Sequence, residues 1–407
     1  MIKSIRLLFQ GKKGFDRNIN LYLLTSLLIN IGFGVIEADF NLYILSMDIS
    51  PDFLGIILSL TPFAQAFAAI PLGFLAEKIG NKRSLILVNL IVGSSYFIRA
   101  ISPNQKLIML GSFLVGTVQA GYFIIQMPFI SHYAGEQRDK EYSFASIAHY
   151  SARAIGNLIG GFLPVLLGSI FLTETSTFRS ILVFASMLII FGTVPLFLLK
   201  KDKPADTSKI SLSPYLHGID KNTVKFATVE FFLGTGFGFL MFFMNVIFVF
   251  YYKSNLQSYG TMSAVMIIPT IIFLIVGPTL AKRYGGLRII LITRIFSAVF
   301  AFLTIITTKT LFGATAYLLF RSFIGLGTSL WLSFASSVST QRSRAATSTW
   351  LEITFQVGFA IAAFGGGQLI ARNAYPALGI ISSVSMLIVF ILTRLFFGKK
   401  YLTTNQV

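Results

Sequence analysis

Apolar residues run along the chain in long blocks that short polar stretches separate. Twelve blocks reach about 20 residues, the length that an α-helix needs to cross the hydrocarbon core of a bilayer. They lie at 19–46, 54–76, 84–101, 107–133, 143–171, 179–199, 224–252, 261–280, 287–307, 311–338, 348–371 and 376–398. The apolar residues cover every face of these blocks, whereas strands of a membrane barrel alternate. The pattern therefore predicts an all-α membrane protein with twelve transmembrane helices.

The longest polar stretch, residues 200–222, lies between the sixth and the seventh block. Its prolines and basic residues are typical of a solvated linker. We therefore expect a bundle of six helices in residues 1–199, a cytoplasmic linker, and a second bundle of six helices in residues 223–407.

An internal repeat relates the two predicted bundles. The repeated pairs are GFG at 32–34 with GFG at 236–238, Asn41 with Asn245, and AEKIGNKR at 76–83 with AKRYGGLR at 281–288. Two parallel halves of six helices are the architecture of transporters that rock around a site near the membrane midplane. The repeat therefore favours a transporter over an ion channel.

Composition and charge support a membrane protein. Of the 407 residues, 55% are hydrophobic and only 12% are charged, too few to cover the surface of a soluble domain. The net charge of +18 comes from basic residues between the apolar blocks, so their expected partners are lipid headgroups and not nucleic acid. If the N-terminus is cytoplasmic, 24 of the 33 Lys and Arg lie on that side. This asymmetry predicts a multi-pass protein of the inner or plasma membrane with both termini cytoplasmic.

The sequence gives little support for an enzyme. It contains no Cys, no G-x-x-x-x-G-K-S/T phosphate loop, and only three His, none followed by another His four residues later. We expect no metal and no cofactor. A membrane-embedded transferase is the alternative from another class, but it would use an acidic metal-binding cluster or a His–acid pair. A twelve-helix unit can work as a monomer.

The stretch GFLAEKIGNKR at 73–83 resembles the loop signature G-x-L-A-D-R-x-G-R-K/R of the major facilitator superfamily. Glu77 stands where Asp is usual, and Asn81 replaces a basic residue. The resemblance implies the twelve-helix fold of that family, with the first, fourth, seventh and tenth helices lining a central cavity. It also implies that Glu77, Lys78 and Arg83 latch the cytoplasmic gate. For the two basic residues, positive-inside anchoring is the alternative interpretation.

Two weaker resemblances concern proton coupling. GNLIGG at 156–161 is similar to the G-P-x-x-G-G element of drug antiporters of this superfamily, although Asn157 replaces the Pro. Close helix packing is the alternative role for its glycines. Many proton-coupled members carry an Arg four residues before a Gly in the fourth helix. This chain has Ser112 there, and it has Arg321 before Gly325 in the tenth helix instead.

Two acids lie inside the first apolar block. A carboxylate in hydrocarbon is costly unless it is paired, hydrated or protonated. Glu37 and Asp39 point about 200° apart on a helix, so they face different neighbours. Glu37 shares a stripe with Asn30, Gly34 and Asn41. We expect Glu37 at the cavity as a proton-coupling group. For Asp39, coupling and pairing with a neighbouring helix both stay open.

The other polar residues of the apolar blocks complete the candidate site. The expected contacts of a small-molecule substrate are Asn30, Asn41, Gln119, Tyr122, Gln126 and Asn245. Arg321 is expected in the cavity, where it holds a substrate anion, takes part in proton coupling or balances Glu37. A permanent ion pair of Glu37 with Arg321 or Arg153 is the alternative to a coupling role. Glu230 and Glu352 lie about two turns from the cytoplasmic helix ends, which favours gating.

These observations together predict a secondary active transporter that works by alternating access. The antiporter resemblance and the apolar, Phe-rich segments favour proton-coupled export of small organic compounds, lipophilic or cationic. Uptake of a metabolite such as a sugar or an amino acid, and the flipping of a lipid, are the transport alternatives.

Overall fold

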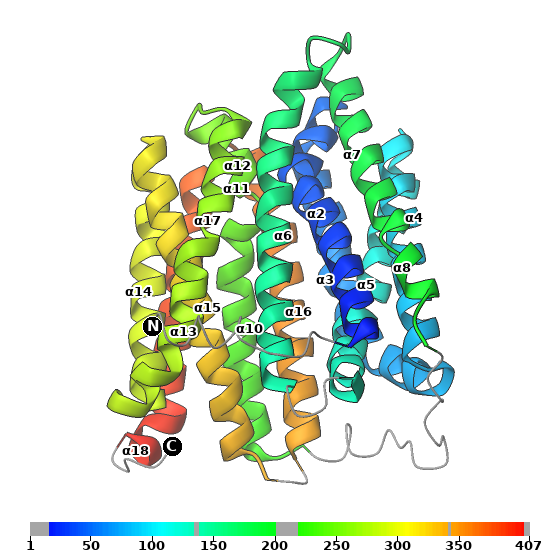
Figure 1. Cartoon of the computed structure of the whole chain (residues 1–407). Coiled ribbons are helices and arrows are strands. Elements are labelled where there is room, and N and C mark those ends of the chain that lie inside the picture. The colour runs from blue at the N-terminus through cyan, green and yellow to red at the C-terminus, as the bar shows by residue number, and fades with distance from the viewer. Residues whose placement is uncertain (1–15, 134–137, 201–218, 341–342, 403–407) are drawn as a thin grey trace.

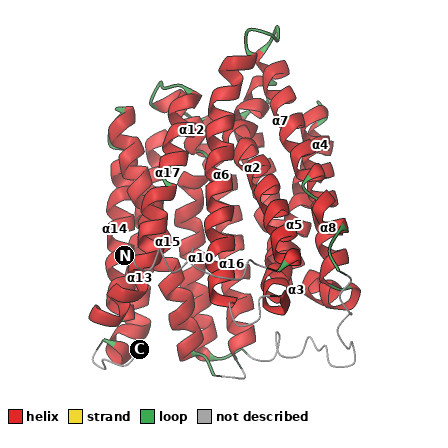
Figure 2. Ribbon diagram, viewed as in Figure 1, coloured by secondary structure: helices red, strands yellow, loops and turns green. Residues whose placement is uncertain are grey.

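The computed structural model describes residues 16–133, 138–200, 219–340 and 343–402. In these ranges the regular elements are helices, which lie side by side along one common direction (Figures 1 and 2). Most of the predicted linker lies outside the described residues, so the predicted division at residues 200–222 stays a prediction.

Every predicted apolar block coincides with a helix or a broken helix. In the first bundle these are α2 (Arg17–Ser46), α3 (Pro51–Ile79), α4 (Asn81–Ile101), α5 (Gln105–Tyr133), α6 (Arg138–Leu167), α7 (Glu174–Phe191) and α8 (Val194–Phe197). In the second bundle they are α10 (Lys221–Met241), α11 (Met244–Val246), the π-helical turn Ile247–Tyr251, α12 (Leu256–Val265), α13 (Ile267–Tyr284), α14 (Gly286–Ile305), α15 (Thr310–Val338), α16 (Arg344–Ala371), α17 (Tyr375–Thr393), the π-helical turn Arg394–Gly398 and α18 (Lys399–Tyr401). Among the described residues, eleven helices are long and apolar enough to cross a membrane. With the 29 residues of α5, the prediction of twelve spans in two bundles is confirmed.

The glycines of the repeated GFG motif lie where helices approach each other closely. A Cβ at Gly32 would lie 2.8 Å from a backbone oxygen of α7, and one at Gly236 would lie 2.9 Å from a side chain of α17. Gly34 faces α6 in the same way as Gly238 faces α16. A side chain at these positions would push the helices apart. The repeat thus gives α2 and α10 equivalent places in their bundles.

The second repeated motif forms equivalent turns. Gly80, between α3 and α4, has a φ of 86°, and Gly285, between α13 and α14, has a φ of 91°. Glycine adopts this conformation without steric cost. In the first of these turns, the Nζ of Lys82 donates hydrogen bonds to the carbonyl oxygens of Phe197 (2.7 Å) and Leu199 (2.5 Å). This basic residue therefore caps the C-terminal end of α8.

Asp220 caps the N-terminus of α10. Its carboxylate accepts hydrogen bonds from the backbone N–H of Thr223 (2.7 Å) and from the Thr223 hydroxyl (2.9 Å). Partial burial raises the pKa of the Asp220 carboxyl, but these hydrogen bonds outweigh burial and hold the pKa below its ordinary value. The ionised form is therefore the one that stabilises the helix.

Replacing Asp220 with alanine is expected to cost about 1 kcal/mol of stability near neutral pH, because an N-cap is lost. A lowered carboxyl pKa stabilises the fold above the unfolded value of 3.8 and is lost as the pH falls through the folded value. The wild type and Asp220→Ala should therefore converge below about pH 4. Thermal unfolding over a pH series measures this difference, and Asp220→Asn, which still caps, is the matched control.

The two bundles meet at α3 with α16 and at α6 with α12. A Cβ at Gly55 would lie 2.8 Å from the Cα of Gly367, and one at Gly161 would lie 2.9 Å from the Cα of Gly260. All four glycines lie toward the end of the molecule at which α2 ends. We call this the outer end, as the loop charges predict, and the end at which α2 begins the inner end. The bundles are therefore tightly packed at the outer end.

Candidate functional site

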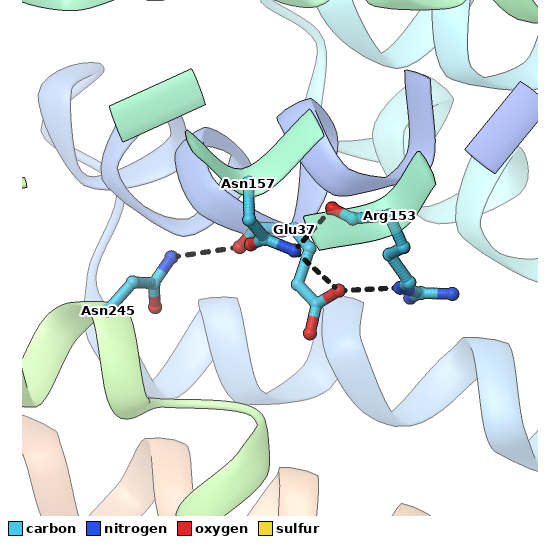
Figure 3. Close-up of polar contacts among 4 residues, drawn as sticks. All are labelled: Glu37, Arg153, Asn157 and Asn245. Carbon is cyan, nitrogen blue, oxygen red and sulfur yellow. Dashed lines mark hydrogen bonds and ion pairs between the residues drawn. The ribbon is translucent and has the colours of Figure 1, made fainter. Parts of the chain in front are cut away.

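An ion pair between Glu37 and Arg153 joins α2 and α6 of the first bundle. The Nε of Arg153 in α6 is 2.7 Å from the Oε2 of Glu37 in α2 (Figure 3). The side-chain amide of Asn157, one turn further along α6, donates to the same oxygen at 3.5 Å and to the carbonyl oxygen of Arg153 at 3.1 Å. Gly34 permits this arrangement, because it brings the backbones of α2 and α6 into contact.

The pair lies deep in the membrane-spanning part and is still accessible to solvent. Glu37 is nine residues from the outer end of α2, about 14 Å along the helix. The side chains of Glu37 and Arg153 are 23% and 32% exposed. A carboxylate and a guanidinium that are partly exposed at this depth are typical of a water-filled transport path.

Arg321 brings a second guanidinium to the same region from the other bundle. It lies in α15 and interacts electrostatically with Glu37. Its Cζ is 5.0 Å from the ring centre of Phe237 in α10. Its Nη1 is buried and has no hydrogen-bond partner among the described residues. The ionisable side chains that interact with Glu37 are Arg153 from α6, Tyr96 from α4, Tyr259 from α12, and Tyr317 and Arg321 from α15.

Asn41 and Asn245 join the two bundles by reciprocal hydrogen bonds. The amide of Asn41 donates to the carbonyl oxygen of Phe242 (2.6 Å) and to the Oδ1 of Asn245 (2.9 Å). The amide of Asn245 donates to the carbonyl oxygen of Ala38 (2.8 Å) and to that of Glu37 (3.3 Å), and Figure 3 shows the second of these bonds. Asn41 and Asn245 are 204 residues apart, and so are Ala38 and Phe242. The two halves of this asparagine clasp are therefore related by the internal repeat.

The clasp lies between the ion pair and the outer end. Asn41 is one turn beyond Glu37 toward the outer end of α2. Asn41 and Asn245 are 5% and 2% exposed, so the clasp leaves little room for water. Together with the glycine contacts at the outer end, it separates Glu37 and Arg153 from the outer side. Both side chains are nevertheless partly exposed.

A family model then identifies the chain. The model described as Major Facilitator Superfamily matches residues 18–348. The chain belongs to the Major Facilitator Superfamily. A search of curated proteins finds no match.

The fold of this superfamily member is similar to those of solved transporters. The nucleoside transporter NupG has a TM-score of 0.76 and 15% identity, with 94% of this chain and 99% of that chain covered. A bacterial homolog of the human lysosomal transporter Spinster, in an inward-facing and occupied conformation, has a TM-score of 0.73 and 16% identity, with 98% and 99% covered. These likenesses show the fold, and the family shows a secondary transporter.

Asp39 has no polar partner among the described residues of this superfamily member. Its side chain is fully buried beside Gly160 of α6, and neither carboxyl oxygen has a hydrogen-bond partner there. An ionised carboxylate without a partner costs far more to bury than the neutral acid. The surroundings of Asp39 therefore favour the neutral acid, whereas Glu37 has the Arg153 guanidinium at 2.7 Å.

Asp39→Asn is expected to leave the melting temperature unchanged, because the amide has nearly the shape of the neutral acid and carries no charge. Asp39→Ala should lower it, since a side chain is removed from a fully buried position. Thermal unfolding of the purified variants tests this pair. If Asp39→Asn lowered the melting temperature as much as Asp39→Ala does, the Asp39 side chain would not be the neutral acid that its surroundings favour.

The residues that the sequence predicted as substrate contacts lie in different surroundings. Asn41 and Asn245 form the clasp. Asn30 is fully buried and donates to the carbonyl oxygen of Ser26 in its own helix (2.8 Å). Gln119 is half-buried in α5. The side chains of Tyr122 and Gln126 lie outside the described residues, so their predicted role stays a prediction.

The predicted gating residues lie in different parts of the structure. Lys78 and Arg83 are exposed at the inner end, and the side chain of Glu77 lies outside the described residues. Glu352 of α16 accepts a hydrogen bond from Gln65 of α3 (3.4 Å). Because α3 and α16 belong to different bundles, this contact suits a gate.

Glu352 and Glu230 have further polar contacts within the second bundle. Gln356 donates to Glu352 from one turn further along α16 (2.8 Å). Glu230 is instead buried inside the second bundle, where it interacts electrostatically with the fully buried Arg294 of α14. Glu230 therefore lies within one bundle, whereas Glu352 lies between the two.

The sequence named Arg153 only as one of several partners of Glu37, and it did not indicate the clasp or Tyr259. Arg153, Asn157 and Gly161 recur every four residues along α6, and this spacing marks the face of α6 that contacts both α2 and α12. The pairing of Asn41 with Asn245 in the repeat is the signal for the clasp, since residues equivalent by a two-fold axis can meet at that axis.

Proposed function

We propose that this protein is a proton-coupled transporter of small organic solutes in which Glu37 binds the coupling proton. The observation that carries the proposal is the Glu37–Arg153 pair, whose side chains are partly exposed although the asparagine clasp lies between them and the outer end. Alternating access exposes such a group to one side and then to the other. The pair is therefore in a position to exchange protons with each side in turn.

Proton binding changes what Arg153 can do. The ionised carboxylate of Glu37 holds the Arg153 guanidinium at 2.7 Å. A protonated Glu37 attracts this cation less, so the guanidinium becomes available to another acceptor. Loading of the proton and rearrangement of the site are thereby linked, which is the requirement for coupling.

The charges around Glu37 bear on the direction of transport. Export of lipophilic or cationic compounds in exchange for protons needs a cation to displace Arg153 from Glu37 while Arg321 adds a second positive charge. The glycines of GNLIGG pack against α2 and α12, so close packing explains them without an antiporter role. We therefore favour an uncharged or acidic solute that moves together with the proton.

The loop charges support the remaining parts of the proposal. We place the protein in the inner or plasma membrane, surrounded by lipid and with both termini cytoplasmic. In this orientation the inner end is cytoplasmic, and Glu77, Lys78 and Arg83 act at the cytoplasmic gate. One chain carries both bundles and the whole site, so a monomer is sufficient.

Proteoliposomes with a trapped pH indicator test this function. Classes of solute, namely organic acids, nucleosides, sugars, amino acids and lipophilic amines, are added outside. We expect at least one class to change the lumenal pH faster than in protein-free vesicles, where organic acids and lipophilic amines cross the bilayer only in their uncharged forms. Uptake of a radiolabelled solute without any proton movement would show a uniporter or coupling to another ion, and would contradict the proposal.

A further inference from the structure

The strongest feature that coupling alone does not explain is the excess of guanidinium groups around Glu37. Arg153 and Arg321 contribute two positive charges, and Glu37 contributes one negative charge. The tyrosines that interact with Glu37 are uncharged at neutral pH. The site therefore carries one uncompensated positive charge among the described residues.

Arg321 forms no ion pair within salt-bridge distance among the described residues, although its guanidinium interacts with the hydroxyl of Tyr317. Its buried Nη1 has no acceptor among the described residues, whereas Arg153 is held by Glu37 at 2.7 Å. A buried donor without an acceptor is unfavourable, so a ligand that supplies an acceptor there gains affinity. A carboxylate or phosphate suits a guanidinium best, because two of its oxygens can accept parallel N–H bonds.

An aromatic ring lies near each of the two guanidinium groups. The Cζ of Arg321 is 5.0 Å from the ring centre of Phe237, and the Cζ of Arg153 is 5.9 Å from that of Phe33. The ring of Phe237 stacks on Phe359 with an interplanar angle of 13°. Such rings offer apolar surface to the body of a ligand whose acidic group is bound by arginine.

We infer that the solute is a small organic acid with one negative charge and an apolar body, bound by Arg321 beside Glu37 and carried together with one proton. This inference rests on the proposed function and names its substrate class. A cation is disfavoured because it would meet two guanidinium groups. A neutral solute would leave the Nη1 of Arg321 without a charged acceptor.

The charges also give the sign of the coupling. A bound acid places a second negative charge near Glu37, which favours protonation of Glu37 because like charges repel. The proton comes from water on the open side. The net charge of the site is +1 when it is empty with Glu37 ionised, and it is again +1 when an acid is bound and Glu37 is protonated. The site can therefore reorient either empty or fully loaded with the same charge.

Binding of matched probes to the purified full chain tests the inference. The probes are phenylacetate and butyrate, each compared with the corresponding amide and amine. Dissociation constants are measured by calorimetry at two pH values one unit apart, and proton uptake is measured in weakly buffered solution. We expect at least one acid to bind more tightly than its amide and amine, up to tenfold more tightly at the lower pH, with one proton taken up per acid.

Variants separate the role of Arg321 from a general loss of structure. Arg321→Gln should weaken acid binding at least tenfold, and Arg321→Lys should retain part of it. Replacement of Arg283, an exposed arginine in the last turn of α13, by Gln should change nothing. In Glu37→Gln the acid should still bind, but without proton uptake and without dependence on pH.

Two results would overturn the inference. One is that an amide or amine binds as tightly as its acid or more tightly, and the other is that neither acid binds. The proposed function survives the first result if proton movement with the amide or amine still requires Glu37. Proton uptake that is equal in the wild type and in Glu37→Gln would instead contradict the proposed function itself.

Discussion

Glu37→Gln is expected to abolish accumulation of solute against a gradient while solute exchange continues. Glutamine keeps an oxygen that can accept the hydrogen bond of Arg153, so the local packing at this 2.7 Å contact survives. It cannot take up a proton, so the pH gradient no longer drives transport. We expect accumulation in proteoliposomes to fall from up to tenfold per imposed pH unit, the limit for one proton per solute, to none. Counterflow of the same solute should be retained.

Asp39→Asn is the matched control for this prediction. It removes a carboxylate two residues away on the same helix, and this carboxylate has no polar partner among the described residues. Asp39→Asn should therefore accumulate solute as the wild type does. Loss of accumulation in Asp39→Asn together with full accumulation in Glu37→Gln would assign the coupling proton to Asp39 and contradict our assignment.

Removal of the asparagine clasp is expected to open the outer end. Each clasp hydrogen bond contributes about 0.5–1.5 kcal/mol, and four of them join the bundles. Because about 1.4 kcal/mol changes an equilibrium tenfold, the double variant Asn41→Ala with Asn245→Ala should shift the population strongly toward the outward-open state. Each single variant should have a smaller effect than the double variant, since the remaining amide keeps its hydrogen bonds to backbone carbonyl oxygens of the other bundle.

Spin-label distances measure this shift. The chain contains no Cys, so Ser50→Cys and Thr308→Cys place the only two thiols at exposed outer connections of the two bundles. Electron–electron resonance should give a longer label distance when the clasp is removed. Thr228→Ala, which loses a hydrogen bond within α10 only, is the control. An unchanged distance in the double variant would show that the glycine contacts alone close the outer end.

The spans of the fold followed from sequence because hydrocarbon imposes one simple rule, a helix of about 20 apolar residues. The pseudo-symmetry followed from GFG, since close helix packing requires small residues at both copies, Gly34 and Gly238. The breaks in the seventh helix did not follow. The interruption after Met241 and the π-helical turn at Ile247–Tyr251 lie within an apolar block of uniform appearance.

The candidate site was less accessible to sequence reasoning. Periodicity placed Glu37 and Asp39 on different faces, and the structure gives them different environments. It could not choose the partner of Glu37, because Arg153 and Arg321 lie 116 and 284 residues away and their distances depend on how whole helices pack. It placed Asn41 and Asn245 at a substrate, which stays a prediction, and it did not indicate that they bond to each other. Side-chain chemistry alone does not distinguish a ligand contact from a contact between bundles.

The most direct test of the central claim is a pH titration of the carboxyl groups by infrared difference spectroscopy on the purified protein. Among the signals of the 15 acidic residues, we expect one carboxylic-acid signal that titrates in the wild type and in Asp39→Asn but is absent in Glu37→Gln. In Arg153→Gln this signal should move to higher pH, because the carboxylate has lost its cation. If no titrating signal disappears in Glu37→Gln, the ion pair is permanent, and Glu37 is a structural group without a coupling proton.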